Sequence, residues 1–202
     1  MVTIIDYGVG NLFSLESSFR KIGEEVCVSS DPDRIRAAER LLLPGVGAFG
    51  DAAARLKESG LYGVIREAAE SGKPLLGICL GMQLLFERGY EYGVHEGLGL
   101  LRGEVVPMKG YIPDGLKIPA IGWNALKIKK ESPLFKYVNS GDHVYFVHSY
   151  YAKCGEDSLL ATAEYGKDVT AAVGYANIFG CQFHPEKSGE VGLSILRAFA
   201  EI

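Results

Sequence analysis

The chain has 202 residues, 48% of them hydrophobic, and a formal net charge of −4. This length and apolar content suffice for one α/β domain with its own core, so we expect residues 1–202 to form a single domain. Lys and Arg form no run, which argues against nucleic acid or an anionic membrane as partner. Because the first residues lack a basic leader and no apolar run approaches the roughly 18 residues that span a bilayer, we expect a cytoplasmic protein.

Short apolar runs alternate with helical patterns in the first half of the chain. This alternation predicts parallel strands joined by crossover helices, and hence an α/β fold. A helix is expected after the first strand, with Asn11 as its N-cap and Gly23 as its stop. The four strands are expected at 2–5, 25–28, 40–43 and 75–78.

Two further helical regions are predicted between these strands. Asp31 followed by Pro32 is typical of an N-cap and a first helical position. The other region covers about 50–71 and should break near Gly60.

The second half of the chain is mainly β. Residues 175–178 resemble a hairpin turn in which Asn177 adopts positive φ. A final helix is expected at 190–202. The strand-like stretches, which should add antiparallel strands to the sheet, are 104–108, 125–130, 143–152, 159–165, 170–175 and 178–183.

The stretch 77-GICLGMQLLFE-87 places a cysteine between two glycines where a strand meets a helix. With serine in the same position, Gly-x-Ser-x-Gly forms a nucleophile elbow that projects the reactive atom from the sheet. Cys79 would therefore be a nucleophile, favoured as thiolate by the start of the following helix. An ordinary buried cysteine flanked by chance glycines is the competing interpretation.

A base for this thiol is suggested by 182-QFHPEKS-188. Pro185 ends sheet pairing, and Glu186 can turn back to the ring of His184, which supplies a nucleophile, a base and an orienting acid. A structural histidine beside a surface glutamate remains the alternative. His95 lies in a glycine-rich loop and is expected to be exposed, while at most one of His143 and His148 can face a given site.

Backbone N–H groups for an oxyanion are expected at two places. The N–H of Leu80 follows the nucleophile in elbow geometry. The stretch 44-PGVGAFG-50 follows a strand and carries glycines that let its backbone approach a ligand, so the N–H of Val46 is the second candidate. The stretch lacks the spacing of a phosphate-binding loop or a dinucleotide turn, and an ordinary loop is the alternative.

The other cysteines, Cys27, Cys154 and Cys181, lie in or at the end of strand-like stretches and are interpreted as structural. The chain has no C-x-x-C pair, so neither a zinc site nor disulfides are expected. We expect no metal and no cofactor.

Together, the stretches 44–50, 77–87 and 182–188 resemble the class I (triad) glutamine amidotransferases. The further stretches 6-DYGVGN-11, 121-IGWN-124 and 145-YFVHSYY-151 are similar to the branch that serves imidazole glycerol phosphate synthase in histidine biosynthesis. The resemblance covers essentially the whole chain, and it implies a flavodoxin-like α/β fold of three layers with a central, mostly parallel sheet and additional antiparallel strands in the second half.

This resemblance implies that glutamine is hydrolysed to glutamate through a thioester on Cys79, with His184 as base and acid and Glu186 orienting it. The ammonia would pass to a (β/α)8-barrel cyclase subunit in a heterodimer. The resemblance also implies two sets of binding residues. Those for glutamine are Gly45, Gly47, Gln83, Glu91 and Ser149, and those for the partner are Asn11, Trp123 and Lys187.

Three alternatives stay open at the level of sequence. The same chemistry could feed a different synthase, for anthranilate or aminodeoxychorismate, although the D-Y-G-V-G-N and G-W-N stretches argue against it. A cysteine hydrolase acting on peptides would release no glutamate from glutamine. A binding scaffold without activity is disfavoured because Cys79, His184 and Glu186 occur together.

Two interpretations of Trp123 also stay open: a position in the core, or a position in an exposed connection at the interface.

Overall fold

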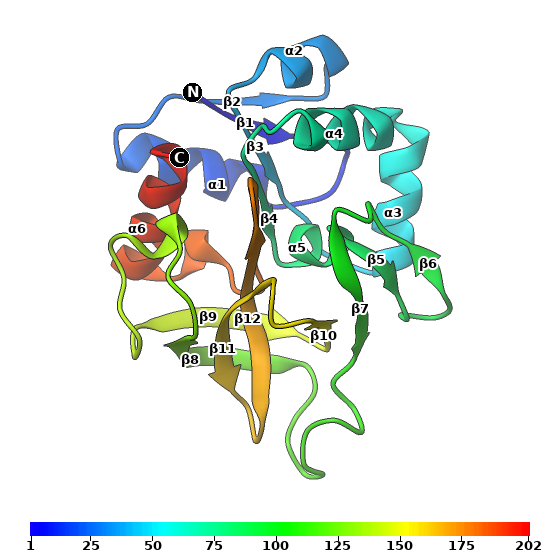
Figure 1. Cartoon of the computed structure of the whole chain (residues 1–202), viewed down its shortest axis with the longest axis vertical. Helices are drawn as coiled ribbons and strands as arrows, with labels where there is room; N and C mark the ends of the chain where they lie inside the picture. Colours follow the sequence, from blue (N-terminus) through cyan, green and yellow to red (C-terminus); the bar gives the residue numbers. More distant parts are fainter.

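The computed structural model describes residues 1–202, and it contains two sheets flanked by helices (Figure 1). The larger sheet has nine strands in the order β2-β1-β3-β4-β13-β12-β11-β8-β9, and the smaller has four in the order β10-β7-β5-β6. The helices are α1 (Leu12–Lys21), α2 (Pro32–Ala37), α3 (Phe49–Glu58), α4 (Leu61–Glu70), α5 (Leu80–Leu84) and α6 (Gly189–Ala200).

The strands of the larger sheet come from both halves of the chain. They are β1 (Val2–Ile5), β2 (Val26–Ser29), β3 (Arg40–Leu43), β4 (Leu75–Ile78), β8 (Ala120–Ile128), β9 (His143–His148), β11 (Leu159–Glu164), β12 (Asp168–Tyr175) and β13 (Ile178–Cys181). The smaller sheet consists of β5 (Phe86–Gly89), β6 (His95–Glu96), β7 (Leu101–Pro107) and β10 (Tyr150–Cys154).

Five neighbouring strands of the larger sheet, from β2 to β13, run parallel. Figure 1 shows α1 and α6 on one side of this part of the sheet and α3 and α4 on the other. Alternate side chains explain the two layers, because Leu41 and Leu43 of β3 pack into one hydrophobic core and Leu42 into the other. The predicted α/β class with a mostly parallel central sheet is therefore confirmed.

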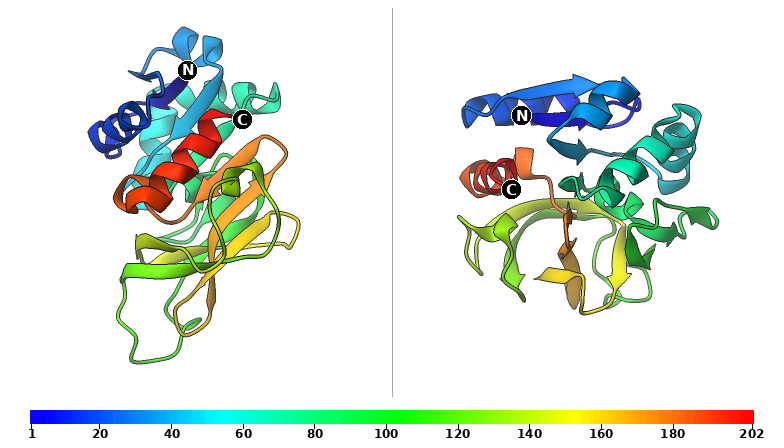
Figure 2. Two further views of the ribbon diagram at one scale, coloured as in Figure 1. Left: turned by 90° about the vertical axis from the view of Figure 1, so that its left-hand side faces the viewer. Right: turned by 45° about the horizontal axis from the view of Figure 1, so that its top comes forward.

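The rest of the larger sheet is antiparallel, as expected for the second half of the chain. Strands β12, β11, β8 and β9 continue it beyond β13. Figure 2 shows these strands as a lobe below the helical layers. The smaller sheet lies beside α3 and α5, where β5 continues the chain from α5 (Figure 1).

Several local predictions are confirmed. The Asp31 side chain caps α2 by accepting from the N–H of Asp33 at 2.9 Å. Gly23 follows the end of α1 with φ +80°, and Gly60 separates α3 from α4 with φ +74°. Each glycine allows the chain to leave a helix in a conformation that other residues avoid.

One local prediction is confirmed only in part, and three are wrong. Asn11 occupies the N-cap position of α1, but its side chain makes no capping bond. In the turn between β12 and β13, Ala176 adopts the positive φ, whereas Asn177 donates from its side-chain amide to the carbonyls of Ala69 and Lys73. The stretch 143–152 is two strands in different sheets, because the chain leaves β9 at Ser149, and 120–124 is the first half of β8 rather than a connection.

Candidate active site

Cys79 lies at the carboxyl end of β4, immediately before α5. Its φ of +53° and ψ of −109° are rare for a residue with a side chain, which marks a sharp and strained strand-to-helix turn. The two glycines allow α5 to lie close against the sheet. A Cβ on Gly77 would lie 2.7 Å from the backbone of Gly81, and one on Gly81 would overlap the carbonyl oxygen of Leu43.

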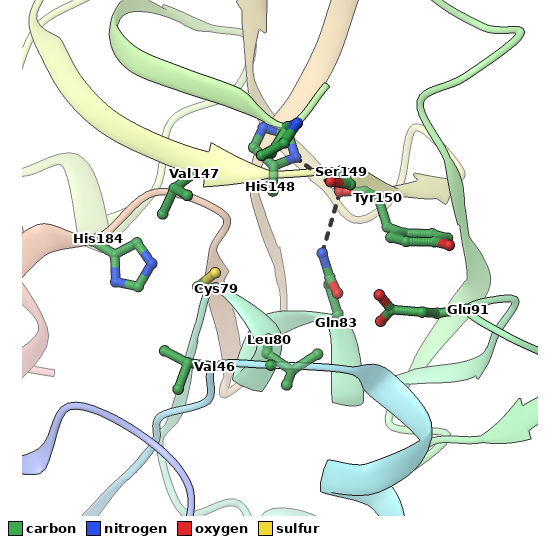
Figure 3. Close-up of a pocket in the computed structure, with 12 residues that line it drawn as sticks. Val46, Cys79, Leu80, Gln83, Glu91, Val147, His148, Ser149, Tyr150 and His184 are labelled. Atoms are coloured by element: carbon green, nitrogen blue, oxygen red, sulfur yellow. Dashed lines mark hydrogen bonds between the residues drawn. The ribbon is translucent and has the colours of Figure 1, made fainter. Parts of the chain in front are cut away.

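His184 follows β13, the strand next to β4, so the carboxyl ends of two adjacent parallel strands bring it beside Cys79 (Figure 3). Its Nδ1 lies 2.8 Å from Oε1 of Glu186, and both side chains are almost fully buried. Because a carboxylate only accepts, Nδ1 carries the hydrogen and Nε2 is free to take a proton. The backbone of His184 is fixed by Ser188, whose hydroxyl donates to the His184 carbonyl at 2.6 Å.

The surroundings of His184 favour its charged form. Burial of the ring lowers the pKa of His184, but hydrogen bonding and charge from Cys79 and Glu186 outweigh burial and raise it to about 9. An imidazolium beside the sulfur is therefore the stable arrangement when the thiol has lost its proton.

A cavity of about 280 Å³ opens above Cys79. Its size is near the lower end of the roughly 300–1,000 Å³ typical of small-molecule sites, which suits a substrate as small as an amino acid. Residues from both halves of the chain line it: Val46, Gly47, Cys79, Leu80, Gln83, Glu91, Pro119, Val147, His148, Ser149, Tyr150 and His184.

Gln83 and Glu91 lie on the side of this cavity away from His184 (Figure 3). Gln83 sits one helical turn beyond the nucleophile, and its Nε2 donates to the carbonyl of Tyr150 at 3.2 Å, so its Oε1 is the atom free to accept from a ligand. The Glu91 carboxylate accepts from the N–H of Phe49, the first residue of α3, at 2.8 Å. This bond holds a carboxylate at the cavity wall, where it can face an ammonium group.

The loop after β3 contributes two residues to the cavity wall. Val46 is exposed, and its N–H donates to no acceptor of the chain. Gly47 follows with φ +97°. The loop's third candidate, Gly45, does not line the cavity. A Cβ at Gly45 would lie 2.8 Å from the N of Gly81, so this glycine brings the loop against the start of α5.

His148 is a cavity residue to which the sequence assigned no role. It is buried at the end of β9, with Nδ1 2.8 Å from the carbonyl of Tyr150. Burial lowers the pKa of His148 to about 4, although the bond to Tyr150 opposes this, and the nearby His184 lowers it further. A neutral His148 therefore stands beside a charged His184. Strand alternation had already indicated that only one of His143 and His148 could face a site.

His95 departs from the sequence prediction. It belongs to strand β6 and is half-buried rather than exposed, because its ring covers Gly50 at the start of α3. A Cβ on Gly50 would lie 2.6 Å from the ring. His95 does not line the cavity.

The three residues expected at an interface do not line the cavity. Trp123 is 52% exposed on β8 and packs edge-on against Tyr145 of β9, with ring centroids 5.9 Å apart. The ammonium of Lys187 lies 5.8 Å from the centroid of the same tyrosine ring. Asn11 directly precedes α1 and follows Gly10, which packs against the loop after β3. A core position for Trp123 is excluded.

No group of three or more His, Cys, Asp or Glu side chains is arranged to hold a metal ion. None of the helices combines the length and apolar character needed to cross a membrane.

Comparison with known proteins agrees with this geometry. The family model for glutamine amidotransferase class-I matches residues 3–201. A solved glutamine amidotransferase superposes with a TM-score of 0.76 at 20% identity over 100% of both chains. PurLQS from Thermotoga maritima superposes with a TM-score of 0.75 at 21% identity over 99% of this chain and 97% of that one. At this identity the structures show the shared fold.

Closer relatives carry the name imidazole glycerol phosphate synthase subunit HisH. One from Lactococcus lactis subsp. lactis is 51% identical over 99% of this chain and 98% of its own length. One from Geobacillus thermodenitrificans is 52% identical over 100% and 96%. One from Wolinella succinogenes is 48% identical over the whole of both chains.

The fold, the cysteine elbow and the family match define a class I glutamine amidotransferase, an enzyme that hydrolyses glutamine. Within that class, the chain belongs to the HisH family of imidazole glycerol phosphate synthase glutaminase subunits.

Proposed function

We propose that this chain releases ammonia from glutamine at Cys79 and passes it to a separate cyclase subunit, HisF. The cyclase, a (β/α)8 barrel, would combine the ammonia with the ribulosyl phosphate intermediate PRFAR to give imidazole glycerol phosphate and AICAR. The names of the relatives support the synthase. The geometry that supports the glutaminase step is the buried His184–Glu186 pair beside a cysteine held in an elbow.

The first half of the proposed reaction forms a thioester. His184 Nε2 takes the thiol proton, and Sγ of Cys79 attacks the side-chain amide carbon of glutamine. The oxyanion accepts from the N–H groups of Val46 and Leu80. Leu80 opens α5, where N–H groups have no partner within the helix, and the N–H of Val46 is likewise unused. The imidazolium then protonates the leaving nitrogen, which departs as ammonia.

The second half regenerates the enzyme. Water gives a proton to His184 Nε2 and attacks the thioester carbon, and the thiolate leaves and recovers its proton from the ring. Glutamate is released, so one water is consumed for each ammonia formed. Glu186 keeps the hydrogen on Nδ1 and stabilises the positive ring in both halves.

Residues on the side of the cavity away from His184 would recognise the substrate. Glu91, held by the N–H of Phe49, would bind the α-ammonium of glutamine, together with Oε1 of Gln83. Gly47 and Ser149 would border the side chain that reaches Cys79, and Gly45 would act indirectly, by placing the loop against α5.

The strip around Trp123, Tyr145 and Lys187, together with Asn11, would bind the barrel, so that ammonia leaves the cavity inside the heterodimer. We place the reaction in the cytoplasm, since all four cysteines are unpaired, as a reducing compartment requires.

Cys79→Ala tests this function in the complex with the cyclase subunit. We expect synthesis from glutamine to stop and synthesis from added ammonium salts to continue, because the second reaction belongs to the partner. The control is Cys27→Ser, which replaces a β2 cysteine that hydrogen-bonds Thr3 far from the cavity and should behave like the wild type. Release of glutamate by the alanine variant at an appreciable rate would refute the thioester mechanism.

A further inference from the structure

Gln182 is a fully buried polar residue that the proposed reaction does not yet use. It follows β13, and the register of the sheet explains its position. Cys181 pairs with Ile78 in parallel strands, and the N–H of Cys79 donates to the carbonyl of Cys181 at 2.7 Å. The next residue along β13 therefore lies beside the next residue along β4, which is Cys79.

The side chain of Gln182 bridges Cys79 and Gln83. Its Oε1 accepts from Nε2 of Gln83 at 2.9 Å, and its Nε2 lies 3.7 Å from Sγ of Cys79. This second distance is within reach of a hydrogen bond to sulfur. Gln182 is completely buried, and Cys79 and Gln83 are exposed only at the cavity, by 8% and 5%.

The orientation of both amides is determined by one backbone group. The carbonyl of Tyr150 can only accept, so Gln83 must direct its NH2 toward it. The same NH2 lies 2.9 Å from the end of the Gln182 amide, so Gln182 must present its oxygen there. Its own NH2 is thereby directed at the sulfur. An amide rotated by 180° would place two NH2 groups together and an oxygen against a thiolate.

We propose that Gln182 is a positioning residue for the nucleophile: its NH2 donates to Sγ of Cys79 and favours the thiolate, and Gln83 keeps the amide in this orientation. The inference deepens the proposed function and rests on it, because it takes Cys79 as the nucleophile. A thiolate accepts such a bond more strongly than a thiol does, so the donor favours the charged form. Gln83 would thus act on the nucleophile as well as on the substrate.

The test measures thiolate formation without glutamine. The isolated full chain is treated with iodoacetamide at pH 7 and pH 10, and the rate at Cys79 is followed by mass spectrometry of its peptide. For Gln182→Met we expect the rate at pH 7 to fall about tenfold, the effect of one hydrogen bond to a charged atom. Ordinary thiols are ionised at pH 10, so the donor should make little difference there and the variant should react as fast as the wild type.

Gln83→Met provides a second variant that does not alter Gln182 itself. It releases the amide of Gln182 to rotate, so we expect a smaller loss at pH 7, roughly threefold, and again none at pH 10. A matched control is Phe183→Leu, which disturbs the neighbouring side chain, packed against Phe146, but removes no donor. It should leave the ratio of the two rates unchanged.

Some outcomes would overturn the inference. If Gln182→Met or Gln83→Met reacts like the wild type at pH 7, or loses the same factor at both pH values, Gln182 does not act on the thiolate. If melting shows that Gln182→Met is unfolded, Gln83→Met alone decides. Glutamine hydrolysis by the wild-type complex is measured in parallel: its absence would refute the proposed function, whereas the alkylation ratios would still decide the role of Gln182.

Discussion

Two histidines at the same cavity have opposite charge preferences. Burial is the largest influence on His148 and lowers its pKa to about 4, since the bond to the Tyr150 carbonyl only partly opposes burial and the nearby His184 adds to the decrease. His184 is buried as well, but the sulfur and a carboxylate face it and raise its pKa to about 9. Because both rings are buried, the opposite directions of their pKa shifts come from the groups that each ring faces, and only His184 favours the protonated form.

The raised pKa of His184 predicts a pH dependence of stability. Its folded-state pKa of about 9 lies above the 6.5 of an unperturbed histidine, so the folded chain holds the extra proton between these values. The contribution is full below about pH 6.5 and is lost as pH rises through about 9. Glu186→Gln removes one cause of the shift, so we expect its destabilisation, about 1–3 kcal/mol at pH 6.5, to shrink toward pH 9.5.

Urea unfolding of the isolated chain between pH 6.5 and 9.5 measures this effect. The matched control is Glu190→Gln, which removes an exposed carboxylate of α6 close in sequence but remote from His184. Its curve should run parallel to that of the wild type. A constant offset for Glu186→Gln across the same range would contradict the assignment of the raised pKa to this pair.

At the scale of elements, the site depends on how closely α5 approaches the sheet. The elbow turns sharply at Cys79, and the helix then passes over β3 and β4 with no room for side chains at Gly77 and Gly81. The same approach brings Leu80 against Gly45, which places the loop after β3 beside the cysteine. One tight contact between elements therefore positions both candidate oxyanion donors.

Gly81→Ala should disrupt this contact. Because the added Cβ would overlap the carbonyl of Leu43, a backbone atom in β3, we expect a loss of roughly 3 kcal/mol or more in the free energy of unfolding. Gly63→Ala is the matched change: it lies in α4 with an ordinary φ and nothing near the new methyl group, so it should stabilise by up to about 1 kcal/mol. Chemical denaturation compares them, and a Gly81→Ala variant as stable as the wild type would disprove the close approach.

For the whole molecule, the cavity mouth is bordered by an exposed aromatic strip on the last two strands of the larger sheet. Trp123 and Tyr145 are cross-strand partners in β8 and β9, and the next pair on the same side is Ile121 with Val147, which reaches the cavity. Ile121 is 60% exposed and Trp123 52%. Large apolar side chains exposed beside an active site are typical of a protein interface.

Trp123→Ala should weaken association with the cyclase subunit by about 2 kcal/mol or more if the ring is an interface anchor. Its exposure means that the isolated chain should melt at nearly the wild-type temperature. Tyr175→Ala serves as control. Tyr175 is 62% exposed but lies at the β12–β13 turn, near the start of β4, whereas Cys79 follows the end of that strand. Calorimetric titration measures the two affinities. If both variants bind the cyclase subunit equally well, Trp123 is not part of the interface.

How much the sequence predicts depends on the range of the interaction. The parallel strands, the break at Gly60 and the elbow at Cys79 follow from short patterns, since periodicity and glycine positions act within a few residues. The errors occur where distant segments decide. The stretch 143–152 is divided at Ser149 because its first half, β9, pairs with β8 and its second half, β10, pairs with β7. The side chain of Asn177 donates to the carbonyls of Ala69 and Lys73, which are distant in sequence.

The sequence by itself thus determined the α/β class, the chain's family and the motifs that carry its chemistry, because these depend on residue type and local spacing. Only the tertiary structure decided which groups meet at the sulfur. Gln182 lies beside Cys79 through the register of β4 and β13, and a carbonyl of β10 sets the orientation of two amides. Contacts between residues about a hundred positions apart depend on sheet order and register, which local spacing does not encode.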